Sequence, residues 1–367
     1  MTKLNAIILV LIAAGSLCGQ ERILPAYTHP IPYQPLHYVC YYTQVPPAID
    51  GFLDEGWEKA SWSTAFGDIQ GSLKPNPPFL TRFKLLWDSS YLYVGLYLQE
   101  SDLWATLVQR DTVIFYDNDI EVFIDPDGDS HYYFEIELNA LGTLWDLLLV
   151  RPYRDMQMNG VFNGWDVRPM RWGVKLFGTL NHNTDQDSAW TVEMAIPLTN
   201  LADGNEQHKI PQEGDRWRMN FSRVQHTLLK SGLSYLRQTD QQGKPLPENN
   251  WTWSPQGRIN LHEPEHWGFV QFTKHLVGAE QVNFVPDPDQ ALIWFLRQIY
   301  YQQKEHRTRY ARYATELKVL NLPEPPGGTD LTWEVGTRQY LVTAKSYDTG
   351  LTWHLRQDGR IWKAPGN

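Results

Sequence analysis

The chain has 367 residues, with 42% hydrophobic and 20% charged residues and a formal net charge of −10. This apolar content supports a sizeable core and excludes a disordered chain, and the length predicts one large domain plus a smaller one. The negative charge excludes a nucleic-acid-binding protein, because no basic stripe is present to neutralise phosphates.

The first twenty residues have the pattern of a secretory signal peptide. Lys3 gives a positive start, residues 6–14 form an apolar run too short to span a bilayer, and small residues follow. We predict that residues 1–19 are a signal peptide and that the protein is secreted, periplasmic or on the cell surface. Cys18 leaves lipidation open, although Leu17 stands where that signal has a small residue. No other stretch is apolar and long enough for a transmembrane segment.

Residues 20–36 contain four prolines, which predict an extended leader without helix. If Cys18 is removed, Cys40 remains as a single thiol that has no intrachain disulfide partner. Cys40 lies in the run HYVCYYT, so we expect it to be a small buried hydrophobic residue.

Period-two alternation dominates the chain from residue 37 to about 274 and predicts many antiparallel strands. Short strands separated by turn residues are typical of a β-sandwich, so we predict a mainly β fold of that class. The strands are expected at 79–88, 89–100, 119–125, 131–138, 143–150, 170–180, 190–197, 216–225 and 267–272.

The pattern changes after Pro288. Apolar residues at helical spacing predict one helix around 292–299, with Asp289 as its cap, and a second around 310–320. Two β segments and a turn at 357–360 follow. Residues 287–367 are therefore expected to form a small helix plus β-hairpin appendix, either a cover for a sheet edge or a docking module.

Several motifs together resemble family 9 carbohydrate-binding modules. In chain order they are AIDGFLDEGWEKASWS (48–63), LLWDSSYLYVGLYLQESDL (85–103), NDIEVFIDPDGD (118–129), WTVEMAIP (190–197) and EPEHWGFVQF (263–272). The resemblance covers about residues 37–274 and implies a β-sandwich, export, carbohydrate binding and commonly bound calcium. The C-terminal appendix lies outside it.

Acidic side chains alternate along 119–125 and 131–138. If the two strands form a hairpin with Asp125 opposite His131, then Glu121 faces Glu135 and Asp119 faces Glu137. Like charges opposite each other destabilise a sheet, so a cation, raised pKa values or nearby arginines are needed. We therefore consider both a calcium site that uses Asp119 and Glu137 and a solvated face with arginine neighbours. The arginines that follow in the sequence are Arg151, Arg154, Arg168 and Arg171.

The run Asp125-Pro126-Asp127-Gly128-Asp129 places oxygen ligands at alternate positions, as in a calcium loop. The sixth and twelfth places of that loop pattern are Ser130 and Ile136 rather than Gly and Glu. We expect a tight hairpin turn here.

The family binds sugar between two tryptophans, with a glutamate and an arginine on the hydroxyls. The resemblance places the tryptophans at Phe115 or Tyr116 and at Leu261, which is a departure from the pattern. It places the glutamate at Glu121 and the arginine near Glu135, a second departure. Other aromatic residues that could replace the clamp are Trp145, Trp165, Trp251 and Trp253.

The predicted ligand-binding residues are Glu121, Phe115, Tyr116, Glu135, Arg154 and Trp165. We expect an exported carbohydrate-binding protein, or an accessory in glycan catabolism, that binds an oligo- or polysaccharide. One alternative is glycoside hydrolase activity, because paired carboxylates could serve as acid and base. The other is a surface scaffold without a sugar site.

Overall fold

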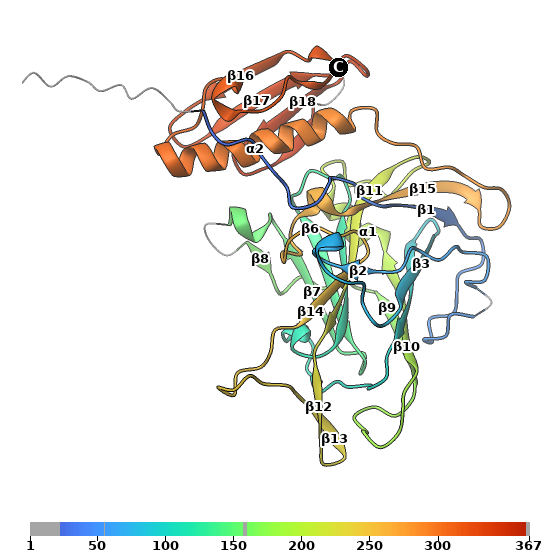
Figure 1. Ribbon diagram of the computed structural model, residues 1–367. Helices are drawn as coiled ribbons and strands as arrows, with labels where there is room; N and C mark the ends of the chain where they lie inside the picture. The colour runs from blue at the N-terminus through green and yellow to red at the C-terminus, as the bar shows by residue number, and fades with distance from the viewer. Residues whose placement is uncertain (1–22, 55, 157–159, 365–367) are drawn as a thin grey trace, which may run out of the picture.

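The computed structural model describes residues 23–54, 56–156 and 160–364. The predicted signal peptide and Cys18 lie outside these residues. The described chain forms a large β-sandwich and a smaller module of one long helix on a sheet, with the leader running between them (Figure 1). None of the described helices combines the length and apolar character needed to cross a membrane.

Thirteen of the described strands join into one hydrogen-bonded sheet that folds over on itself. They are β1 (His37–Tyr42), β2 (Gly67–Asp68), β3 (Thr81–Trp87), β4 (Tyr91–Gln99), β5 (Asp119–Asp125), β6 (Tyr133–Asn139), β7 (Leu144–Leu149), β8 (Val161–Phe162), β9 (Arg171–Phe177), β10 (Ala189–Pro197), β11 (Arg216–Gln225), β14 (Asn249–Thr252) and β15 (Gly268–Leu276). Their order is β8-β7-β6-β5-β11-β15-β1-β3-β4-β10-β9, with β14 on β11 and β2 on β14.

Strand β1 joins the two halves of the sandwich, because it pairs in parallel with both β15 and β3. The other pairs of this sheet are antiparallel, as predicted. Inward-facing residues of β5 and β6, such as Val122 and Ile136, share one core with Val94 of β4 and Val192 of β10. Alternation therefore sends the intervening residues of β5 and β6 to the outer face. Cys40 is fully buried, as expected.

Short elements complete the sandwich. A separate hairpin is formed by β12 (Leu228–Ser231) and β13 (Ser234–Arg237). The helical turns are α1 (Leu198–Leu201), η1 (Gly71–Leu73), η2 (Ile114–Tyr116), η3 (Tyr153–Asp155), η4 (Ala202–Gly204) and η5 (Pro264–His266).

The C-terminal module packs helix α2 (Gln290–Tyr310) against a four-stranded antiparallel sheet. The strands are β16 (Leu331–Val335), β17 (Tyr340–Lys345), β18 (Thr352–Arg356) and β19 (Ile361–Lys363). Phe295 and Ile299 of α2 meet Val342 and Leu355 in a second core. Asp289 stands at the predicted cap position, but its carboxylate accepts hydrogen bonds from the sheet, including 2.7 Å from the Trp353 indole.

The predicted second helix around 310–320 is wrong. Helix α2 ends at Tyr310, and the next residue, Ala311, has a left-handed backbone with φ 57°. Only the 3-10 turn η6 (Leu317–Leu320) follows before η7 (Pro326–Gly328). The apolar spacing is real, since Tyr313, Ala314 and Leu320 lie in the second core. A folded-back loop buries them as well as a helix would.

A buried ion pair ties β11 to the end of β4. Arg223 and Glu100 are both buried, and the guanidinium lies 2.8 Å from the carboxylate. The same guanidinium also donates to the Gln99 carbonyl and the Thr81 hydroxyl. The pair therefore connects the two halves of the sandwich.

We expect Arg223→Ala to lower the free energy of unfolding by roughly 3–5 kcal/mol, because it leaves Glu100 as an uncompensated buried charge. Arg309→Ala is the control: it removes an exposed pair with Glu305 and is worth only about 0.5 kcal/mol. Denaturant unfolding followed by tryptophan fluorescence measures both. An equal loss of unfolding free energy in the two variants would contradict the role of the Arg223–Glu100 pair in connecting the two halves of the sandwich.

Candidate functional site

The outer face of β5 and β6 carries the predicted acidic side chains. Ile120, Val122 and Ile136 point into the core. Asp119, Glu121, Glu135 and Glu137 consequently share the opposite face, as their alternation predicts.

The register of this hairpin differs from the predicted one. Glu121 lies opposite Glu137, Asp119 opposite Asn139, and Glu135 opposite Phe123. The connecting turn is longer than expected because it takes in residues 126–132. The Asp125 carboxylate stabilises that turn by accepting hydrogen bonds from the backbone N–H groups of residues 128 and 130, each at 2.9 Å. The shift by two residues keeps the acidic side chains on one face.

The remaining carboxylates of the acidic run also take part in the turn. Asp129 accepts a hydrogen bond from the His131 backbone at 2.7 Å and forms an ion pair with Arg360 at 2.5 Å. The connection differs from the tight hairpin turn expected here, because it runs over residues 126–132. Oxygens of Asp125, Asp127 and Asp129 lie within 4.8 Å of one another, so the carboxylate grouping of the calcium-loop alternative is present as well.

Three carboxyl groups form a buried cluster on the outer face. Oxygens of Asp119, Glu121 and Glu137 lie within 4.8 Å of one another, and the residues are only 0%, 2% and 1% exposed. Both Asp119 oxygens and Oε2 of Glu121 have no hydrogen-bond partner among the described residues. Glu137 accepts one hydrogen bond, from the Phe115 backbone N–H at 3.2 Å. We call Asp119, Glu121 and Glu137 the acidic cluster.

Burial raises the pKa of every carboxyl on this face. Loss of hydration is the main cause for all three members of the acidic cluster, and repulsion from neighbouring carboxylates raises their pKa values further. Burial also raises the pKa of Glu135 to about 8. At neutral pH these groups therefore need either protons or a cation.

The arginines considered as neighbours of this face pair with other groups. Arg154 lies 2.9 Å from Glu265 and 3.3 Å from Asp155, so the structure pairs it with these two carboxylates and its role as a sugar ligand stays a prediction. No local pattern indicates this pairing, because Glu265 lies in η5, far from Arg154 in the sequence. Arg151 pairs with Asp358, Arg168 pairs with Asp166, and Arg171 lies over the Tyr91 ring.

The basic side chain that lies beside Glu135 is a histidine. His262 Nε2 lies 4.0 Å from the Glu135 carboxylate. Burial, reinforced by the positive charge of Arg154, lowers the pKa of His262 to about 3, so its ring is neutral. It does not balance the negative face.

Phe115 and Tyr116 lie at the rim of the acidic cluster, in η2 immediately before β5. Asp117 holds this turn by accepting hydrogen bonds from the backbone of Thr106 and Leu107 at 2.7 and 2.8 Å. Tyr116 is 52% exposed and its ring lies 5.0 Å from that of Phe115. The backbone of η2 thus contacts Glu137, and the accessible Tyr116 ring lies against Phe115 of the same turn.

Trp165 does not belong to this face. Its ring packs at 4.6 Å on Phe134, which points into the core on the other side of β6. Trp251 and Trp253 are likewise buried in that core. Leu261, the second clamp position, is partly buried against Trp267 and contributes no exposed ring.

Cross-strand register adds polar groups in line with the acidic cluster. Trp145 lies opposite Glu137, Ser222 lies opposite Glu121, and Thr252 lies opposite Ser222. The indole N–H of Trp145 and the Thr252 hydroxyl have no hydrogen-bond partner among the described residues. Sequence reasoning missed Ser222 and Thr252 because the pairing of β11 with β5 and β14 is set by the fold. Together with the carboxyls they make an oxygen-rich set that suits a hard cation.

The pKa of Glu135 predicts a specific pH dependence. Its folded-state pKa of about 8 exceeds the ordinary value of 4.5, so the folded state retains a proton that the unfolded state loses. This contribution to stability is lost as pH rises toward 8. In the presence of a chelator, we expect the denaturant concentration at the unfolding midpoint to decrease as the pH is raised from about 6.5 to about 8.5. This range lies above the one in which neutral buried histidines titrate.

The Glu135→Gln variant should show a smaller decrease of this midpoint with pH. The control variant Glu305→Gln changes an exposed carboxylate and should show the same decrease as wild type. Denaturant melts at a series of pH values measure the slopes. Parallel slopes for wild type and Glu135→Gln would mean that Glu135 is ionised normally in the folded protein.

The solved structures that match this chain share little sequence with it. A protein of Bacteroides uniformis ATCC 8492 is 15% identical, with 65% of this chain and 100% of that chain covered and a TM-score of 0.44. Two structures of a family 9 carbohydrate-binding module from Caldicellulosiruptor kristjanssonii contain cellotriose and glucose. They are 17% and 16% identical, cover 68% and 67% of this chain and 100% of their own, and have TM-scores of 0.40 and 0.41.

A search of curated proteins gave no match. The sequence model of the carbohydrate family 9 binding domain-like family matches residues 49–275, which is more than half of the chain and includes the acidic cluster and its aromatic rim. This chain therefore belongs to the carbohydrate family 9 binding domain-like family.

Proposed function

We propose that this protein is exported, binds an oligo- or polysaccharide beside the acidic cluster, and serves as an accessory in glycan breakdown. Membership of a carbohydrate-binding family supports the ligand class. The signal-peptide pattern of residues 1–19 supports export. The observation that supports the choice of site is the exposed Tyr116 ring in η2, the turn whose Phe115 backbone N–H donates to Glu137 of the acidic cluster.

Sugar recognition needs a flat apolar surface and hydroxyl-binding groups. The Tyr116 ring, supported by Phe115, supplies the surface on which the apolar face of a pyranose stacks. Arg237 lies 5.6 Å from the Tyr116 ring and adds a donor at the rim. Glu121 and Glu135 lie deeper, so they act on the sugar from beneath the rim rather than as its main contact surface.

We propose a calcium ion for the acidic cluster. The fit rests on the orphaned atoms: two oxygens of Asp119, one of Glu121 and the Thr252 hydroxyl are buried without partners. Asp119, Glu121 and Glu137 would hold the ion, and Ca²⁺ prefers such oxygen ligands. The ion would supply positive charge that keeps these carboxyls ionised and the face rigid under the sugar.

Removal of the Tyr116 ring tests the sugar surface. We expect Tyr116→Ala to weaken retention on the best-bound polysaccharide by about tenfold, because one stacking contact is lost. Tyr347→Ala is a matched control, since Tyr347 is also exposed but lies in the C-terminal module. Affinity electrophoresis across a panel of soluble polysaccharides measures both variants. Equal retention of wild type and Tyr116→Ala would place the sugar elsewhere.

Calcium is tested separately. We expect isothermal titration of chelator-treated protein with Ca²⁺ to show binding that Asp119→Asn abolishes and that the exposed-site variant Asp203→Asn retains. At a Ca²⁺ concentration about 100 times Kd, the wild type gains about 2.7 kcal/mol of stability. Absence of a calcium-dependent gain in stability would show that the cluster is neutralised by protons alone.

A further inference from the structure

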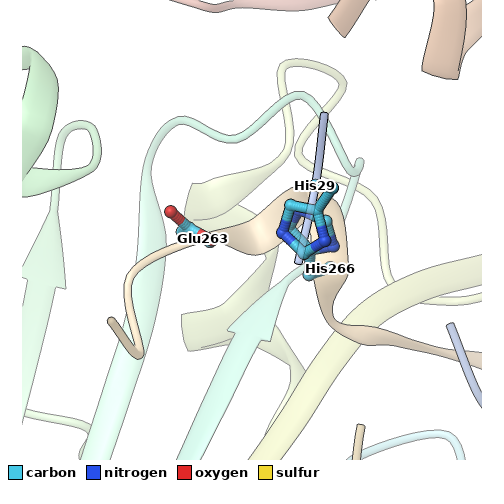
Figure 2. Close-up of side chains that lie close together, drawn as sticks. All are labelled: His29, Glu263 and His266. Atoms are coloured by element: carbon cyan, nitrogen blue, oxygen red, sulfur yellow. The ribbon is translucent and has the colours of Figure 1, made fainter. Parts of the chain in front are cut away.

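Two histidines and a glutamate meet where the leader crosses the sandwich (Figure 2). His29 belongs to the leader, whereas Glu263 and His266 belong to the loop and turn η5 that precede β15. One possible ligand atom from each of the three lies within 4.8 Å of the other two. The two imidazole rings are stacked with centroids 4.3 Å apart.

Each of the three side chains presents an unused atom. Nε2 of His29, Nε2 of His266 and Oε2 of Glu263 are buried and have no hydrogen-bond partner among the described residues. Glu263 and His266 are only 2% and 3% exposed. Buried polar atoms without partners cost free energy, so a ligand that satisfies all three at once is favoured.

Hydrogen bonds to the other side-chain atoms of His29 and Glu263 leave their unpartnered atoms free for a cation. His29 Nδ1 lies 2.9 Å from the carbonyl of Ile31, which can only accept, so Nδ1 carries the proton and Nε2 has the lone pair. Glu263 Oε1 accepts a hydrogen bond from the Asn260 amide at 3.1 Å. Such hydrogen bonds fix the orientation of a side chain that binds a metal, here those of His29 and Glu263.

The protonation states agree with this geometry. Burial lowers the pKa of His266 to about 3 and also lowers the pKa of His29, so both rings are neutral and able to ligate. Burial, with the negative charge of Glu265, raises the pKa of Glu263 to about 7. A bound cation would restore the carboxylate form.

The charges that surround the cluster set limits on affinity. Arg154 and Arg258 each lie 3.8 Å from Glu263 and oppose a cation. Arg154 is compensated by Glu265 at 2.9 Å, and the Arg258 side chain is 38% exposed and screened by solvent. The remaining local charge does not forbid a dication, but it argues against very tight binding.

We propose that His29, Glu263 and His266 form a site for a transition-metal dication of the zinc type. Two imidazole nitrogens and one carboxylate oxygen are a common zinc ligand set, with a fourth position left for water. Metal–ligand distances of about 2.1 Å require the three atoms to approach one another by side-chain rotation from their present spacing. Nitrogen ligands also separate this site from the oxygen-only acidic cluster.

Such an ion would connect the leader directly to the sandwich and, through contacts with Trp294, to the C-terminal module. His266 contacts Trp294 of α2 with ring centroids 5.4 Å apart, and Tyr33 of the leader stacks on the same Trp294 at 3.7 Å. Metal binding would therefore hold three segments of the chain that are far apart in sequence.

The test uses tag-free, chelator-treated full-length protein with Zn²⁺ and Co²⁺ alone as probes. We expect one equivalent of Zn²⁺ to bind, and Co²⁺ to give the visible absorption bands of a tetrahedral site. His266→Gln and His29→Gln should each weaken Zn²⁺ binding by at least about a hundredfold, since loss of a residue that only hydrogen-bonds to a metal ligand already weakens binding by up to about that factor.

Two controls separate this site from others. His208→Gln, an exposed histidine, and Asp119→Asn, in the acidic cluster, should bind Zn²⁺ like wild type. Thermal melts without metal establish that each variant is folded, and His29→Gln changes only a half-buried leader residue. Wild-type protein that binds no Zn²⁺, or folded His29→Gln and His266→Gln variants that bind it unchanged, would overturn the proposal.

Discussion

The acidic face depends on one constraint: strands β5 and β6 bury their branched apolar residues on one side and therefore present their carboxyls together on the other. That outer face is itself covered, so the carboxyls are desolvated as well as crowded. Among the described residues no arginine or lysine pairs with Asp119, Glu121 or Glu137. The face is stable only with bound protons or a bound cation, and the proposed sugar site lies at its edge.

Much of the sandwich could be predicted because each strand carries its own alternation. Strand β11 occupies the predicted residues 216–225, and the acidic side chains share the predicted face. The register of β5 and β6 could not be predicted, because the length of the turn depends on hydrogen bonds made by Asp125. The partner of Arg154 and the packing of Trp165 on Phe134 depend on contacts between distant segments, which no local pattern records.

Local sequence patterns also fail to predict the long-range contacts of the leader and of the C-terminal module. The prolines indicate extended chain, and residues 23–36 contain no helix, but nothing in the sequence indicates that His29 meets His266. The apolar spacing around 310–320 suits a helix, yet the left-handed turn at Ala311 brings the same residues into the second core as a loop. Periodicity indicates which residues are buried more reliably than it indicates the backbone that buries them.

We propose that a cation neutralises the carboxyls of the acidic cluster. Long-wavelength anomalous diffraction from crystals grown with calcium chloride tests this proposal. We expect an anomalous peak bounded by oxygens of Asp119, Glu121 and Glu137. A map without a peak there, in which these carboxyls are hydrogen-bonded to one another as neutral acids, would contradict it.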